Sequence, residues 1–138
     1  MEQRDYLMRQ IDQLGQALAK ALAGLLGLEK PSQINEAIKT TNQFLKNELA
    51  LDIEDLVAIP SADFINILII EKKFTIESLR KLADILLFIA DNSSNEKEQT
   101  TRNKLYSKCL IILEYLEKTE TTCFFDQKMI IERIKNIL

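Results

Sequence analysis

Apolar residues recur every three or four positions along most of the chain, which is the spacing that lines one face of an α-helix. Breaks in this repeat coincide with turn-forming and helix-capping residues, so they divide the chain into segments of helical length. The pattern predicts six to seven helices, at residues 5–27, 32–51, 53–59, 62–73, 75–91, 93–118 and from about 123 to the end. We therefore expect an all-α fold, an irregular stack of antiparallel helices.

Capping residues stand where several of these segments begin, and each can accept a hydrogen bond from a free amide of a first turn. The candidates are Ser32, Asp52, Ser61, Thr75 and the pair Ser93 and Glu96. The fifth segment carries the broadest apolar stripe and is expected to be the most buried helix. In the last helix the residues expected to face the core are Phe125, Met129, Ile130, Ile134, Ile137 and Leu138.

One stretch, residues 64–70, is apolar enough to be read as a β-strand. A single strand has no partner for its backbone groups in an otherwise helical chain, and the segment has the length of a helix. We expect a helix there.

The chain has 138 residues, 46% of them hydrophobic and 28% charged, with three glycines and two prolines. These values are typical of one globular domain, so residues 1–138 are expected to form a single helical domain. The net charge of −3 and the dispersed Lys and Arg residues argue against nucleic-acid binding. No signal-peptide core or membrane-length apolar tract occurs, so a cytoplasmic location without a membrane partner is expected. A membrane-surface helix at residues 5–27 is disfavoured because its few basic residues are matched by acidic ones.

The chain contains no histidine, which removes the imidazole on which many catalytic and metal-binding sites depend. Cys109 lies on an apolar helical stripe and is expected to pack, while Cys123 near a helix start is the better candidate for a reactive thiol. A disulfide between them is disfavoured in a reducing compartment. Acidic residues gather between positions 48 and 71 without a calcium-loop spacing, so helix capping and solvation explain them better than metal binding. We expect no metal and no cofactor.

Two stripes on the first helix favour contact with another helix. Apolar residues alternate at steps of four and three, as in a heptad seam, and small residues occupy a second side of the same helix. The seam residues, a possible self-association surface, are Leu7, Ile11, Leu14, Leu18, Ala21 and Leu25, and the small ones are Gly15, Ala19, Ala23 and Gly27. A homodimer is one interpretation of the seam, and packing within the chain is the other.

Residues 75–118 resemble a degenerate tetratricopeptide repeat. Leu86, Ile89 and Ala90 are similar to that motif's first-helix Trp, Leu and Gly positions, and Tyr106, Cys109 and Leu110 to its second-helix Tyr, Ala and Leu. Arg102 stands where a small residue is usual, and residues 32–51 agree only at Ala37 and Leu45. The segments DYLMRQIDQLGQALAKALAGLLGL and SLRKLADILL also resemble a family of short bacterial all-helical proteins with no assigned activity. The first resemblance implies a tetratricopeptide-like helical hairpin, and the second implies a helical fold.

The sequence as a whole favours a non-enzymatic module that binds a protein or peptide partner or a second copy of itself. The alternative is a small enzyme or ligand carrier, which would place carboxylates, a tyrosine or Cys123 in a pocket between helices. The tyrosines available for such a site are Tyr6, Tyr106 and Tyr115.

Overall fold

The computed structural model describes residues 2–27, 34–92, 99–119 and 125–138 of the chain. Within these ranges every regular element is helical and none is a strand, which confirms the all-α prediction. The elements are α1 (Glu2–Leu26), α2 (Ile34–Leu49), α3 (Ile53–Ala58), α4 (Phe64–Asn66) with a π-helical turn (Ile67–Glu71), α5 (Ile76–Asp91), α6 (Gln99–Thr119) and α7 (Phe125–Ile137).

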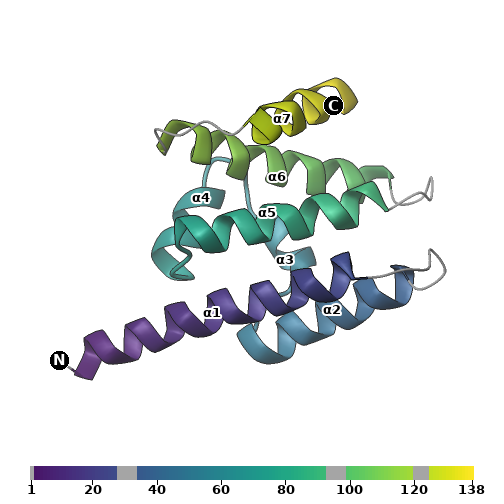
Figure 1. Cartoon of the computed structure of the whole chain (residues 1–138). Helices are drawn as coiled ribbons and strands as arrows, with labels where there is room; N and C mark the ends of the chain where they lie inside the picture. The colour runs from purple at the N-terminus through teal and green to yellow at the C-terminus, as the bar shows by residue number, and fades with distance from the viewer. Residues whose placement is uncertain (1, 28–33, 93–98, 120–124) are drawn as a thin grey trace.

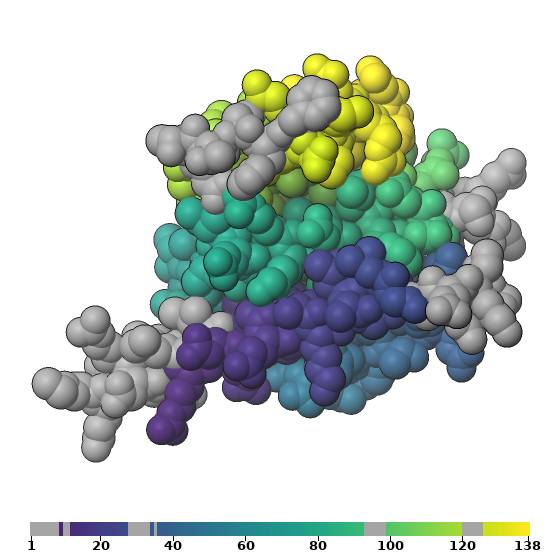
Figure 2. All heavy atoms as spheres, viewed as in Figure 1, coloured from purple at the N-terminus to yellow at the C-terminus, as the bar shows by residue number. Residues whose placement is uncertain are grey.

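The long helices form two antiparallel hairpins, α1–α2 and α5–α6, and the hairpins stack through contact between α1 and α5 (Figure 1). Helices α1 and α5 run in the same direction, and the first turns of α5 lie beside the middle of α1. Helix α7 packs on the outer side of α6, and α3 and α4 contact α6 from another side. In Figure 2 the spheres of α1, α5 and α7 lie on one continuous face of the molecule.

The core lies between the two hairpins and continues between α5 and α6. Helix α5 supplies eight buried residues, and this confirms the expectation that it is deeply embedded. Leu18 and Leu25 of α1 meet this layer from one side, while Ile112 and Leu116 of α6 meet it from the other. Burying large aliphatic side chains stabilises the fold by roughly 1.5–3 kcal/mol each.

Two predicted caps are confirmed. The Asp52 carboxylate accepts from the amide of Glu54 at 2.9 Å, and the Thr75 hydroxyl accepts from the amide of Ser78 at 3.2 Å. Ser32, Ser93 and Glu96 lie outside the described residues. The cap predicted at Ser61 is wrong, because the fourth segment becomes helical only at Phe64 and begins at Asp63, without a side-chain cap.

Residues 64–71 are helical, as expected, although the last turn is wider than an α-helix. The amide of Lys72 donates to the carbonyl of Ile67, five residues earlier, at 3.1 Å. The segment still buries Phe64, in its first turn, and Leu68, in the widened turn, completely. The segment is therefore a short helix pressed against α6, and the strand interpretation does not apply.

A lysine inside the molecule holds the turn between α3 and α4 against α6. Lys108 is buried among apolar residues, and its ammonium donates to the backbone carbonyl of Ile59 and, at 3.2 Å, to the hydroxyl of Ser61. The same ammonium lies 5.2 Å from the ring centre of Phe64. Burial lowers the pKa of Lys108. The ammonium thus completes the end of α3, where the negative end of the helix dipole favours a cation.

The predicted inward face of α7 is partly wrong. Met129, Ile137 and Leu138 are exposed, whereas Ile134 is buried as expected and Ile131, which had not been singled out, is buried beside it. The reason is that, among the described residues, α7 packs against α6 and reaches the end of α5 through Arg133 and Asp91, so one narrow stripe is buried. The side chain of Phe125 lies outside the description.

Candidate functional site: an open groove between α1 and α5

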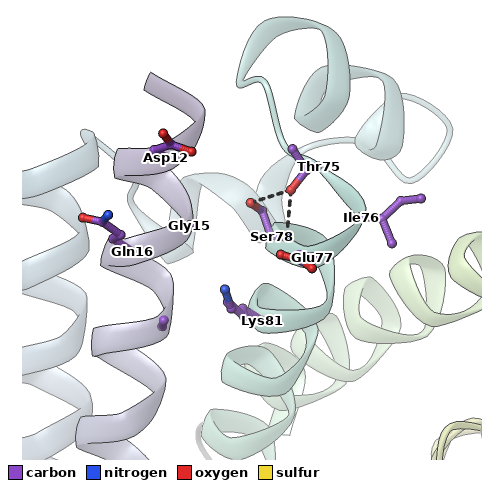
Figure 3. A pocket seen from close by; sticks show the side chains of 9 residues that line it. Asp12, Gly15, Gln16, Thr75, Ile76, Glu77, Ser78 and Lys81 are labelled. Carbon is purple, nitrogen blue, oxygen red and sulfur yellow. Dashed lines mark hydrogen bonds between the residues drawn. The ribbon is translucent and has the colours of Figure 1, made fainter. Parts of the chain in front are cut away.

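A groove of about 530 Å³ lies between the middle of α1 and the first turns of α5. Figure 3 shows Asp12, Gly15 and Gln16 on the α1 side and Thr75, Ser78 and Lys81 on the α5 side. The groove is open to solvent. A small molecule in it would therefore stay partly solvated.

Small residues create the groove. The two helices are held together by buried Leu14 and Leu18, and on the adjoining side of α1 the residues are Gly15 and Ala19. A Cβ atom built on Gly15 would meet no atom within 4 Å, so the space in front of this residue is empty. The missing side chains let another backbone approach α1 closely, as small residues do wherever helices pack tightly.

On the α5 side of the groove, hydrogen bonds between Thr75 and Ser78 cap the first turn of the helix. The Thr75 hydroxyl accepts from the Ser78 amide, and the two hydroxyl oxygens lie 3.0 Å apart. Ser78 is buried although it is polar. The cap uses an amide that would otherwise attract an anion at the positive end of the helix, so this wall is not arranged as a phosphate-binding site.

Three charged side chains line the groove: Asp12 on α1, and Glu77 and Lys81 on α5. Within the part of the chain that the structure describes, none of the three forms an ion pair. Charges that are solvated and unpaired in the free protein can be matched by a partner without first breaking an internal contact. The groove therefore combines close backbone access with charges that are free to select a partner.

Two smaller hollows, of about 350 and 300 Å³, lie side by side where α2 and the π-helical turn end. They share Ala50, Leu51, Glu71 and Lys72. Two non-glycine residues near them have left-handed backbone conformations, Ala50 with φ 52° and Lys73 with φ 61°. Acidic residues from the predicted cluster reach these hollows, but the described residues contain no group of three potential metal ligands.

Cys109 is packed inside the molecule, in agreement with its predicted role. Its Sγ lies 3.3 Å from the carbonyl oxygen of Ala83, to which the thiol donates. Burial, followed by the nearby charges of Asp84 and Asp91, raises the pKa of this thiol to about 12. A thiol with so high a pKa is a poor nucleophile at neutral pH. Cys123 lies outside the described residues.

The tyrosines are not brought together. Tyr106 is buried and its hydroxyl donates to Asp91 at 2.6 Å, while Tyr115 is half-buried against the core. Burial, and then the hydrogen bond and charge of Asp91, raise the pKa of Tyr106. The side chain of Tyr6 is outside the description. Neither described tyrosine lines one of the three hollows.

The predicted heptad seam is used inside the chain as far as it is described. Leu14, Leu18, Ala21 and Leu25 are buried in the core of the single chain, whereas nothing is described of the side chains of Leu7 and Ile11. These four side chains already contact the core of their own chain, so they offer no free surface to a second copy. Self-association through the seam stays a prediction for solution measurements.

No protein-family model matches the chain, and comparisons with curated proteins and with solved structures find no match either. None of the described helices is long and apolar enough to cross a bilayer.

Proposed function

We propose that this chain is a non-enzymatic interaction module that binds a protein or peptide partner along the groove between α1 and α5. The observation that carries the proposal is the open floor of the groove at Gly15, beside charged residues that form no ion pair within the described part of the chain. Both features favour the binding of a helix, because close approach gives contact area and charges that a partner can match give selectivity.

The environment of the titratable groups supports this proposal over the enzyme alternative. Tyr106 and Cys109, two groups whose pKa values are raised, make internal contacts and lie away from the groove. A catalytic pocket is expected to bring perturbed groups and a binding cavity together. The alternative would need carboxylates, a tyrosine or Cys123 to line a pocket between helices.

We also propose that the module is tetratricopeptide-like, and the stacking of two antiparallel hairpins supports this. Repeats of that kind bind partners along surfaces formed by one helix of each hairpin. In this chain, α1 and α5 are the corresponding helices, since they lie side by side and run in the same direction (Figure 1).

The proposal is tested by filling the groove. Immobilised wild-type protein and a Gly15→Phe variant are exposed to the same native lysate, with Gly15→Ala as a matched control. A Cβ at position 15 meets no neighbour, so both variants are expected to fold and Gly15→Ala to retain the captured proteins. Loss of specific proteins from Gly15→Phe alone supports the groove. Identical captured sets from all three would refute it, and a small molecule retained by all three would favour the ligand carrier.

A further inference from the structure

The last helix lies on the molecule as a separate amphipathic helix (Figure 1). Among its described side chains only Ile131 and Ile134 are buried, with Ile130 partly covered, whereas α5 buries eight residues. Met129 on the outer side is 56% exposed. The attachment of α7 thus depends on a few aliphatic contacts and on polar contacts at two points.

The polar contacts fix the direction and register of α7. Near its start, the Gln127 amide donates to the carbonyl of Leu113 at 3.2 Å. Six residues later, the Arg133 guanidinium holds both carboxylate oxygens of Asp91, at 2.9 and 3.1 Å. The hydroxyl of Tyr106 donates to the same carboxylate. A bidentate pair is geometrically specific, so the covered surface selects a helix with an arginine at one position.

These contacts define an interaction surface together with the chemistry of its occupant. The surface consists of one side of α6, including Tyr106 and Leu113, and the carboxylate of Asp91 at the end of α5. Its occupant is an amphipathic helix with isoleucines at positions i, i+1 and i+4 and arginine at i+3, which is the spacing of Ile130, Ile131, Ile134 and Arg133.

We propose that α7 is an exchangeable helix, and that this surface of α5 and α6 accepts the α7 of a second copy when its own α7 is released. Two observations support release. Few of the described side chains of α7 are buried, and the Arg133–Asp91 pair is partly open to solvent, with 46% and 34% of the two side chains exposed, where ion pairs contribute little. Exchange of an identical element between copies is a low-cost route to association. This surface is distinct from the α1–α5 groove, so the inference goes beyond the proposed function.

The probe is a synthetic, fluorescein-labelled peptide of residues 125–138, titrated with the full-length chain and followed by fluorescence anisotropy. In the wild-type chain the tethered α7 competes at a high effective concentration, so the peptide binds weakly. An Ile134→Ala change in the chain, but not in the peptide, weakens only the competitor. The peptide should then bind about thirtyfold more tightly or better, the factor expected for deletion of most of a buried isoleucine side chain.

Matched variants separate exchange from general loosening of the fold. Met129→Ala in the chain, on the exposed side of the same helix, should leave peptide affinity at the wild-type value. Arg133→Ala in the chain should raise affinity by up to about fivefold, as expected for an exposed pair, and a peptide carrying Ile134→Asp should not bind. Circular dichroism confirms that each chain is folded.

Equal peptide affinities for the wild-type, Ile134→Ala and Met129→Ala chains would overturn the proposal. Binding of the Ile134→Asp peptide as tightly as the native peptide would overturn it too, because the surface would then not recognise α7. Neither result depends on Gly15 or the α1–α5 groove, so failure of this inference is distinguishable from failure of the proposed function.

Discussion

Truncating Lys108 is expected to destabilise the protein more than a typical lysine substitution, because its ammonium joins three parts of the fold. In Lys108→Ala, the carbonyl of Ile59 and the hydroxyl of Ser61 lose their donor, and the ring of Phe64 loses the cation beside it. The turn between α3 and α4 would then lose its hydrogen bonds to Lys108 of α6.

The magnitude follows from these contacts. A hydrogen bond from a charged donor contributes roughly 1.5–3 kcal/mol, and a partly desolvated cation–π contact about 0.5–2 kcal/mol. Removing the ammonium also relieves the desolvation that lowers its pKa, which offsets part of the loss. We therefore expect the free energy of unfolding to fall by about 2–3 kcal/mol. Lys108→Met retains most of the aliphatic stem and should lose about 1–2 kcal/mol.

Urea denaturation followed by circular dichroism measures these differences, with Lys104→Ala as the matched control. Lys104 is exposed on the same helix, one turn earlier, and its removal should change stability by no more than about 0.5 kcal/mol. If Lys108→Ala and Lys104→Ala were equally stable, the assignment of Lys108 as the tie between α3, α4 and α6 would be wrong.

Three further results are expected. Burial lowers the pKa of Lys108 below its ordinary value of 10.5, so between the folded pKa and 10.5 the unfolded chain binds more protons than the folded chain. Urea titrations should therefore show that the stability of the wild type, relative to Lys108→Met, rises with pH through that window. A stability difference that falls with pH would contradict the assignment. Ala50→Gly and Lys73→Gly should each raise the free energy of unfolding by about 1 kcal/mol, because both positions have a left-handed backbone that glycine adopts without strain. The control Ala19→Gly, inside α1, should lower it by a similar amount. If both changes at positions 50 and 73 destabilised the protein, relief of backbone strain would be excluded as the explanation. In a Cys123→Ser variant, Cys109 should react with a thiol reagent only as fast as the protein unfolds, and rapid labelling of the folded protein would show that the site opens.

The helical segments were predictable because their determinants are local. Apolar spacing and side-chain caps act within a few residues, and the structure confirms them at Asp52 and Thr75. Ser61 was misassigned as a cap because the helix begins only at Phe64, and the Ser61 hydroxyl instead accepts from Lys108, a residue distant in sequence. No spacing along the chain reveals a hydrogen bond between positions 47 residues apart.

The groove was only half predictable. The small residues on one side of α1 are visible in the sequence, and so is the heptad seam beside them. Which side faces the core depends on where α5 packs, and that is a tertiary property. Since the structure buries Leu14 and Leu18, the side that carries Gly15 and Ala19 remains open. The overprediction at Met129 has the same origin, because α7 has neighbours on one side only.

The central claim, that the groove between α1 and α5 is where this chain meets a partner, is tested most directly by a photo-crosslinking amino acid at position 15. The site accommodates a side chain within the folded protein because a Cβ there meets no neighbour. Irradiation in native lysate should join position 15 to a discrete protein, whereas the same crosslinker at exposed Lys39 on α2 should not capture it. Adducts that are absent at position 15, or identical at positions 15 and 39, would contradict the account.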